Sequence, residues 1–414
     1  MIETYMKQAE QDCQTKHESI GTIVEINQKR VLDAFKRNRV SDSHFHSTTG
    51  YGYDDTGRET LEALYAEVFG GEDALVRPQI VSGTHAISTA LFALLRPGDE
   101  LVYITGKPYD TLESVIGKNR EDSGSLQDFG IIYKEVPLLA NGLVNYQEIN
   151  RVITAKTKVI GIQRSKGYDD RPSFTINQIQ EMVQVVKEIN PEILVFVDNC
   201  YGEFVEEREP LHVGADLIAG SLIKNPGGGI VRSGGYIAGR TDLVLQCGHR
   251  LTAPGLGKET GATLHMLQEM YQGFFLAPHV VGEALKGAVL TARFLELLGY
   301  SPSPTYQAER TDLIQSVTFP DAAQMIAFCQ TIQMNSPVNA FVTPVPSPMP
   351  GYDDDVIMAA GTFIQGASLE LTADGPIRAP YTAFVQGGLT YEHVKIALKE
   401  AAKQLIEKGL LQVK

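Results

Sequence analysis

The sequence predicts an α/β protein that has a mostly parallel sheet in a large domain and a smaller α+β domain at its C-terminal end. Two observations lead to this prediction. Segments that are apolar throughout alternate with amphipathic helical segments, which is typical of a parallel sheet covered by helices on both faces. After about residue 299 the pattern changes to short strand-like segments mixed with helices. We expect an N-terminal arm over 1–57, the large domain over 58–285 and the small domain over 286–414.

The N-terminal arm is predicted to be a helix followed by an irregular loop. Residues 1–40 carry an irregular apolar stripe on one side and Lys and Arg on the other. The segment 41–57 mixes Ser, Thr, Asp and Gly with two tyrosines, Tyr51 and Tyr53. That composition is typical of a loop, and long loops inside compact proteins are often functional.

The large domain is predicted to begin with an amphipathic helix over 58–70. Further helices are expected at 85–95 and at 175–189, and the second of these ends just before Pro191. The strands that we expect in this domain are residues 74–81, 100–104, 131–138, 157–163, 192–198 and 215–222.

The C-terminal part has a different pattern. Residues 259–299 are predicted to form long helices, and 316–333 a strand followed by a helix. Segments 367–372 and 382–388 are typical of strands, and 391–409 is a clear terminal helix.

Charge and composition exclude several classes of protein. Of 414 residues, 36 are Lys or Arg and 50 are Asp or Glu, so the formal net charge is −14. Because nucleic-acid binding needs a net basic face, we expect no nucleic-acid partner. No run of about 18 apolar residues occurs, so we expect no membrane span. The four cysteines stand far apart without a CxxC pair, which favours a reducing compartment and a cytoplasmic protein.

Three segments could carry chemistry. Ser82, Gly83 and Thr84 lie between a strand and a helix, where backbone N–H groups and hydroxyls can hold a phosphate; an ordinary helix cap is the alternative. Asp198 stands at the C-terminal tip of a buried strand, where it faces the ligand crevice or acts as a turn residue. Lys224 follows the next buried strand and precedes a proline and three glycines.

The order of these segments predicts a pyridoxal 5′-phosphate (PLP) site. In such a site Lys224 forms the Schiff base with the cofactor. Asp198 keeps the pyridinium nitrogen protonated, so that the ring accepts electrons from the substrate.

The chain resembles a known family in three motifs. These are TGRETLEALYAEVFGGEDALVRPQIVSGTHAISTALFALLRPGDE, LVYITGKPYDTLESVIG and GSLIKNPGGGIVRSGGYIAG. They are similar to fold-type I PLP enzymes of the cystathionine/methionine lyase group, and most of all to the aluminium-resistance, methionine γ-lyase-like branch. The resemblance covers the chain from about residue 40. It implies an aspartate aminotransferase-type, PLP-dependent transferase-like large domain and a smaller C-terminal domain.

The resemblance also implies roles for individual residues. Ser82, Gly83, Thr84 and Ser221 would bind the cofactor phosphate. Tyr109 matches the tyrosine that stacks on the pyridine ring and acts as an acid or base.

For the substrate, the resemblance implies that Arg378 clamps the carboxylate of an amino acid, a bidentate task suited to guanidinium. Tyr51 or Tyr53 would reach the phosphate of a neighbouring subunit, so a homodimer or homotetramer with shared active sites is expected.

This chain departs from the family pattern at three places. The arginine that is usual in the phosphate-contacting loop is not at the matching place, although Arg58 lies near. Ile223 stands before the lysine where the family often has Thr, and 163–168 (QRSKGY) replaces the usual Asn-Pro beside the cofactor oxygen. These departures put the phosphate contacts and the substrate preference in question.

We therefore expect a PLP-dependent carbon–sulfur lyase that acts on a sulfur amino acid of the cystathionine, cysteine or methionine type by β- or γ-elimination. The same machinery can run an aminotransferase or a racemase. From other classes, Ser221 and Lys224 match the S-x-x-K motif of serine acyl-enzymes, but no K-T-G accompanies it. An inactive PLP-fold binding protein is a further alternative.

Three histidines are further candidates for site residues. His44 and His46 form an HxH pair, but no third ligand stands out, so we expect no metal site. His85 follows the phosphate-binding segment and either touches the ring or simply starts the helix.

Overall fold

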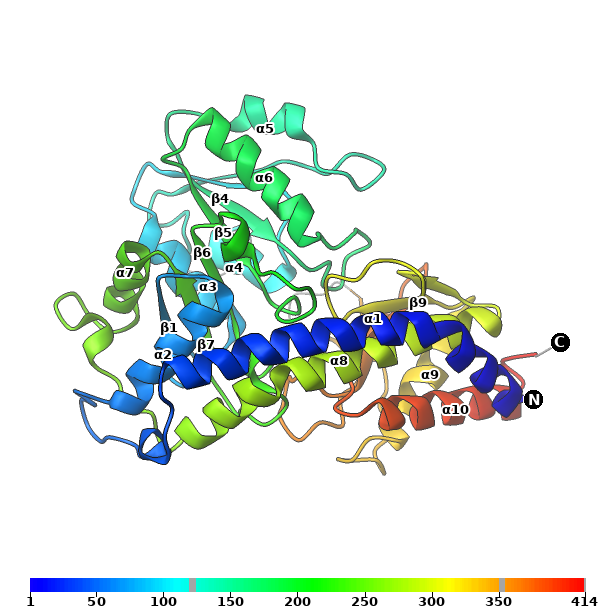
Figure 1. Ribbon diagram of the computed structural model, residues 1–414. Helices are drawn as coiled ribbons and strands as arrows, with labels where there is room; N and C mark the ends of the chain where they lie inside the picture. Colours follow the sequence, from blue (N-terminus) through cyan, green and yellow to red (C-terminus); the bar gives the residue numbers. More distant parts are fainter. Residues whose placement is uncertain (119–123, 350–353, 413–414) are drawn as a thin grey trace.

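The computed structural model describes residues 1–118, 124–349 and 354–412. Two sheets are joined by two long helices, α1 (Ile2–Arg37) and α8 (Leu267–Leu297), which lie side by side along most of the molecule (Figure 1). The predicted N-terminal helix is therefore confirmed. The α/β class and the mostly parallel sheet are confirmed as well.

The larger sheet has seven strands in the order β1-β7-β6-β5-β4-β2-β3. Within it only β7 runs antiparallel to its neighbours β1 and β6. The strands are β1 (Asp73–Arg77), β2 (Glu100–Tyr103), β3 (Ile132–Glu135), β4 (Thr157–Gln163), β5 (Leu194–Asp198), β6 (Leu217–Ser221) and β7 (Gly235–Gly239). Six of them coincide with predicted strands, and β7 was not predicted as one.

Helices cover both faces of this sheet, and their ends carry clear start and stop signals. The helices are α2 (Thr56–Phe69), α3 (Gly83–Leu94), α4 (Asp110–Ile116), α5 (Tyr146–Val152), α6 (Ile176–Ile189) and α7 (Thr241–Leu251). Asp55 caps α2 by accepting from the N–H of Arg58, and Gly70 ends that helix at a φ of 81°. A left-handed C-terminal residue of this kind favours glycine.

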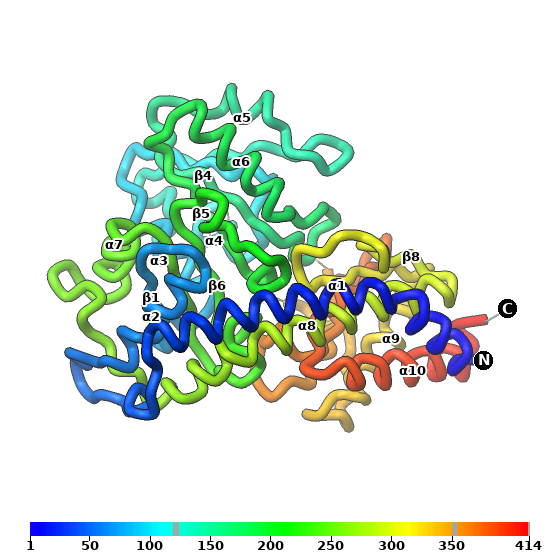
Figure 2. Tube along the Cα trace, viewed as in Figure 1, coloured from blue at the N-terminus to red at the C-terminus, as the bar shows by residue number. Residues whose placement is uncertain are grey.

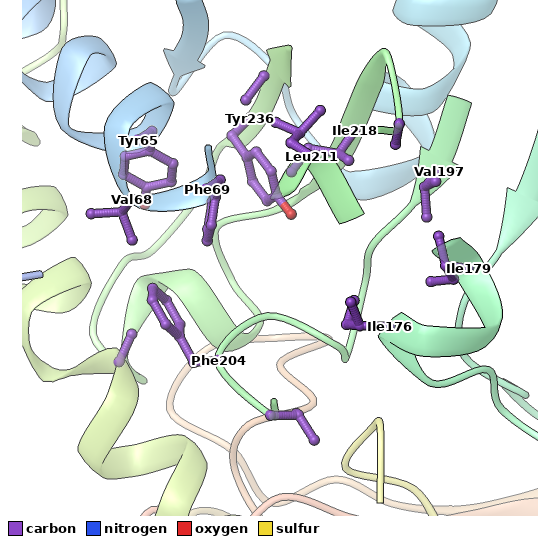
Figure 3. Close-up of a cluster of buried hydrophobic side chains, with 14 of the residues drawn as sticks. Tyr65, Val68, Phe69, Ile176, Ile179, Val197, Phe204, Leu211, Ile218 and Tyr236 are labelled. Carbon is purple, nitrogen blue, oxygen red and sulfur yellow. The ribbon is translucent and has the colours of Figure 1, made fainter. Parts of the chain in front are cut away.

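An aromatic cluster fills the space between α2, β7 and α8. The rings of Tyr65 and Phe274 stack with centroids 3.9 Å apart, and Phe69, Phe204 and Tyr236 surround them. Figure 3 labels Tyr65, Phe69, Phe204 and Tyr236 of this group and several aliphatic side chains beside them. All five side chains are buried, and burying an aromatic residue of this size is worth about 3–5 kcal/mol on replacement by Ala. The cluster therefore packs β7 against α2 and α8.

The smaller sheet is antiparallel, in the order β10-β11-β12-β9-β8. Its strands are β8 (Ser301–Ser303), β9 (Gln315–Thr318), β10 (Val356–Ala359), β11 (Thr372–Pro376) and β12 (Thr382–Gln386). Helix α9 (Ala322–Met334) packs against it, and α10 (Tyr391–Glu407) packs against α9 and α8.

Two predictions for the C-terminal part need correction. The segment 367–372 is not a strand, because β11 begins only at Thr372, and the buried carboxylate of Glu370 accepts the N–H groups of Phe363 and Ile364 instead. The region 259–299 holds one long helix from Leu267 rather than several.

The two long helices contact both sheets. The start of α1 packs into the core of the small sheet through Met6 and Ala9, whereas Val31 and Ala34 pack into the core of the large sheet. Figure 2 follows α1 and α8 across both parts of the molecule. Because α8 runs through the expected boundary between residues 285 and 286, the division into domains stays a prediction.

Helix α8 is long and apolar enough to cross a membrane by length and composition alone. Its most apolar window is 72% buried inside the protein. It is therefore explained as a core helix, and within the described residues no other helix passes that test.

Candidate active site

A cavity of about 380 Å³ lies beyond the C-terminal ends of β4, β5 and β6. In an open α/β sheet this edge is where ligands bind. The structure brings eight of the predicted site residues to this one cavity. They are Ser82, Gly83, Thr84, Tyr109, Asp198, Ser221, Lys224 and Arg378.

The predicted phosphate-binding segment forms the start of α3. Ser82 Oγ accepts the N–H of His85 at 3.0 Å, so the serine is also an ordinary helix cap. A Cβ at Gly83 would lie 3.3 Å from Cys200 Sγ and 3.4 Å from Ser221 Cβ. The missing side chain thus leaves room for an anion at the N-terminal end of a helix, where the free N–H groups favour negative charge.

Tyr109 closes the cavity from the start of α4. Its N–H donates to Gln163 Oε1 at 2.8 Å, and its hydroxyl donates to Thr84 Oγ1 at 2.9 Å. Burial, with a further contribution from the charge of Asp198, raises the pKa of the Tyr109 hydroxyl. The phenol is therefore held neutral and oriented toward the phosphate-binding segment.

Asp198 ends β5 and is only 5% exposed. Its Oδ1 accepts the N–H of Cys200 at 3.1 Å. Burial raises the pKa of the Asp198 carboxyl, and the positive charge of Lys224 opposes that shift. Among the described residues it has no ion-pair partner within 4.0 Å, so a cationic group in the cavity would relieve its desolvation.

Lys224 follows β6 and points into the cavity over the ring of Tyr201, with Nζ 4.0 Å from the ring centroid. Burial disfavours the charged amine, but the acidic groups of Cys200 and Tyr201 outweigh that effect, and the pKa of Lys224 is raised. The turn after it requires glycine, because a Cβ at Gly227 would collide with the carbonyl oxygen of Leu222.

Arg378 stands at the mouth of the cavity on the small-sheet side. Its side chain is 59% exposed, and Nη1 lies 3.4 Å from Oδ2 of Asp354. This weak, exposed pairing leaves the guanidinium able to turn toward a substrate carboxylate.

Tyr51 and Tyr53 do not line the cavity of their own chain. They are 67% and 52% exposed, and their rings stack with centroids 5.4 Å apart. Arg58, which lies near the phosphate-contacting loop in the sequence, is buried and donates to the carbonyl oxygens of Gly52 and Gly261 at 2.6 and 3.1 Å. The side chain of Arg58 therefore stabilises the conformation of this loop from inside the protein.

The histidines lie outside the cavity lining. His85 Nδ1 accepts the N–H of Val81 at 3.2 Å, so the ring caps its own helix start. His44 Nδ1 accepts the N–H of Ser41, and its ring stacks on Tyr271. Among the described residues no group of three His, Cys, Asp or Glu side chains could hold a metal ion.

The structure adds lining residues that the sequence reasoning did not single out. They are Lys107, Pro108, Asp110, Thr111, Asp169, Cys200, Tyr201, Gly366 and Pro376. Cys200 and Tyr201 follow Asp198 by two and three residues, so the rule that strand ends carry ligands could have found them. The replaced segment 163–168 supplies Gln163, Lys166 and Tyr168 to the same cavity.

The donor set fits PLP. Three groups surround one cavity: the amine of Lys224, the unpaired buried carboxylate of Asp198 and the helix N-terminus at Ser82. The amine suits the aldehyde of PLP, the carboxylate suits its pyridine nitrogen, and the helix N-terminus suits its phosphate. Ser221 Oγ accepts the N–H of Ile223 at 3.4 Å.

Comparison with known proteins supports the same conclusion. The family model of methionine gamma-lyase matches residues 2–406. A Bacillus subtilis protein of uncharacterised function, YnbB, is 63% identical over 405 residues, which cover 98% of this chain and 96% of the relative. L-methionine gamma-lyase of Pseudomonas putida is 28% identical over 207 residues, which cover 49% of this chain and 45% of that enzyme.

Solved structures agree over the whole chain. A carbon-sulfur lyase involved in aluminium resistance from Clostridium novyi has a TM-score of 0.94 at 48% identity, and the match covers 98% of this chain and 96% of the other. A Listeria monocytogenes protein, with a proposed assignment as a cystathionine beta-lyase involved in aluminium resistance, has a TM-score of 0.96 at 62% identity, covering 97% and 99%. The predicted fold and PLP-dependent assignment are thus confirmed, and the chain belongs to the methionine gamma-lyase family.

Proposed function

We propose that this protein is a PLP-dependent carbon–sulfur lyase that cleaves a sulfur amino acid of the cystathionine, cysteine or methionine type by β- or γ-elimination. The observation that carries the proposal is the single cavity where Lys224, Asp198, Tyr109 and Arg378 meet. An amine base, a buried carboxylate, a neutral phenol and a carboxylate receptor are the groups that such an elimination needs.

PLP supplies an electron-withdrawing ring that stabilises negative charge at the substrate Cα. Asp198 would face the pyridine nitrogen and keep it protonated, because the buried carboxylate gains a cationic partner in this way. Ser82, Gly83, Thr84 and Ser221 would hold the phosphate.

Proton transfer falls to two side chains. Lys224, whose Nζ is buried in the cavity, would remove the proton from the substrate Cα once its amine is free and neutral. The Tyr109 hydroxyl, held by Thr84, would protonate the leaving thiol or stabilise its developing charge. In γ-elimination a second proton has to leave the substrate Cβ, and Lys224 is the base within the same cavity.

Arg378 would fix the substrate carboxylate so that the bond to be broken stands perpendicular to the ring. Such positioning contributes to the rate without new chemistry.

The loop with Tyr51 and Tyr53 would complete the site of a neighbouring subunit, in a homodimer or a homotetramer. Its support is the position of both rings, exposed and outside the cavity of their own chain. We also propose that the protein works in the cytoplasm, where its four buried free cysteines stay reduced.

The decisive experiment uses purified protein loaded with PLP. Cystathionine and methionine are assayed for release of a thiol, and cysteine and homocysteine for release of hydrogen sulfide, each together with release of the keto acid. Lys224→Ala is expected to abolish turnover and to leave no cofactor attached after borohydride reduction and denaturation. Turnover of none of the four substrates, in a protein that does retain PLP, would contradict the lyase assignment.

The same assay separates the alternatives. An aminotransferase would form keto acid only with an amino acceptor and release no thiol, and a racemase would change the substrate's optical rotation without consuming it. Acylation of Ser221 by a β-lactam would instead support the serine acyl-enzyme.

A further inference from the structure

A second cavity borders the active-site cavity and shares one wall residue, Lys166, with it. Its volume is about 390 Å³, within the size range of small-molecule sites. Three segments form it: 140–142, 166–173 after β4, and 303–312 before β9. It therefore lies between the large-sheet and small-sheet parts of the chain.

Three cationic side chains line this second cavity: Lys166, Arg171 and Arg310. Lys166 is 5% exposed, and its Nζ donates to Ser316 Oγ at 3.2 Å. Over the described ranges, none of the three cations lies within 4.0 Å of a carboxylate oxygen. Buried cations without an anionic partner are rare in proteins, because their desolvation is not repaid.

The two guanidinium groups also hold unused donors. Arg171 is 9% exposed and uses Nη2 to donate to Ser165 O at 2.6 Å, while its Nε and Nη1 have no acceptor in the described structure. Arg310 uses Nη2 on Gln315 Oε1 at 2.5 Å, and its buried Nε and Nη1 likewise have no acceptor there. A buried donor of this kind is normally satisfied by protein, water or a bound ion.

The acidic residues nearby compensate the cations only in part: the charge of Asp312 favours the charged form of all three, but none of the carboxylates in the described part of the chain lies within ion-pair distance of them. Asp312 is buried, but its Oδ2 accepts from Ser165 Oγ and Ser173 Oγ and its Oδ1 from the N–H of Ile314. Asp170 and Glu309, which also line this cavity, are exposed residues at its rim.

The pKa shifts agree with a positive site whose burial is only partly offset by Asp312. Burial lowers the pKa of Arg171 and of Arg310 to about 10 each, and it lowers the pKa of Lys166 as well. An anion placed among the three groups would favour their charged forms and raise all three values.

We propose that this second cavity binds a small organic anion through one carboxylate or phosphate group, which accepts from Arg171 and Arg310 and pairs with Lys166. Guanidinium groups suit both chemistries, because their donors match two oxygens at once. The exposed Asp170 and Glu309 at the rim disfavour a ligand with further negative charge near the opening.

The test is isothermal titration of the PLP-loaded protein, in which the cofactor covers the phosphate-binding segment. Inorganic phosphate and malonate serve as the two probes, and sodium chloride at equal ionic strength is the reference. We expect saturable binding of at least one probe, and the better probe distinguishes a phosphate from a carboxylate ligand. Binding is expected to persist in Arg378→Gln, which removes the carboxylate receptor of the active site.

Variants locate the binding to the second cavity. Arg310→Gln and Lys166→Gln are each expected to weaken the better probe about tenfold or more, since each loses a charge-assisted contact. Arg37→Gln, on the exposed surface of α1, is the matched control and should bind as wild type. Arg171 is left intact because it also supports the chain at Ser165. Absence of saturable binding to both probes, or unchanged binding in both cavity variants, would overturn the proposal and assign water to the unused donors.

Discussion

The hydroxyl of Tyr109 donates a 2.9 Å hydrogen bond to Oγ1 of Thr84, which joins the start of α4 to the phosphate-binding end of α3. The phenol of Tyr109, which is the proposed acid, is thus hydrogen-bonded to the proposed phosphate site. The backbone N–H of the same tyrosine donates to Gln163 Oε1 at 2.8 Å. The ring therefore has little freedom, which is what a group that must meet a leaving sulfur requires.

Replacing that hydroxyl tests the proposed acid. Tyr109→Phe keeps the ring and its packing but removes the proton, so we expect turnover to fall about 100-fold or more while PLP stays bound. Steady-state thiol release and the visible absorption of the cofactor measure the two effects. Tyr146→Phe, which alters a partly exposed hydroxyl paired with Glu181, is the matched control. Equal loss in both variants, or loss of the cofactor from Tyr109→Phe, would contradict a role in proton transfer.

Arg378 allows a prediction about binding rather than chemistry. Arg378→Gln is expected to lower kcat/KM by about 10- to 100-fold, mostly through a higher KM, because a bidentate contact to the substrate carboxylate is lost. Arg378→Lys should recover only part of the loss, since a point charge cannot replace the planar fork. A substrate analogue without the α-carboxylate supplies the control, because the wild type and both variants should handle it alike. A change in kcat alone would place Arg378 elsewhere in the reaction.

The large sheet was predictable from sequence because most of its strands are apolar throughout. Segment 157–163 is the clearest example, and it coincides with β4. Strand β7 escaped prediction because Gly234 and Gly235 make its start resemble a loop. It exists because it pairs with β1 and β6, and a Cβ at Gly235 would crowd Ile80. Long-range pairing of this kind leaves no local period in the sequence.

The residues of the candidate site were likewise only partly predictable from the sequence. Asp198 and Lys224 were predictable because each follows a buried strand, and strand ends of a parallel sheet meet at one edge. The resemblance placed segment 163–168 beside the cofactor, but the positions of Lys166 and Tyr168 were not predictable, because they lie on an irregular loop whose path depends on contacts with the small sheet, such as Lys166 with Ser316. The residues alone also could not show that Tyr51 is exposed and does not line the cavity of its own chain.

Mixing two inactive variants tests whether active sites are shared. Lys224→Ala lacks the amine, and Tyr51→Ala/Tyr53→Ala lacks the proposed contacts to a neighbour's phosphate. If subunits exchange these loops, co-refolded mixtures contain hybrids in which one site has all wild-type groups, and activity should return to about one quarter of wild type. Each variant alone should have the wild-type oligomeric state, measured by light scattering. No recovery in mixtures that demonstrably contain hybrids would assign both tyrosines to a purely local role.

Asp374 predicts how stability depends on pH. Burial raises the pKa of this carboxyl from 3.8 to about 7, although Tyr168 donates to its Oδ2 at 3.1 Å. Because the folded value lies above the unfolded one, the neutral acid favours the folded state below about pH 4, and that contribution is lost as the pH rises to about 7. The difference between the two pKa values corresponds to a loss of about 4 kcal/mol in the free energy of unfolding. Asp374→Asn keeps the shape without the ionisation, so its free energy of unfolding relative to wild type should rise between pH 4 and pH 7. Urea unfolding of both proteins across this range measures the difference, and a constant offset between them would show that Asp374 ionises normally in the folded protein.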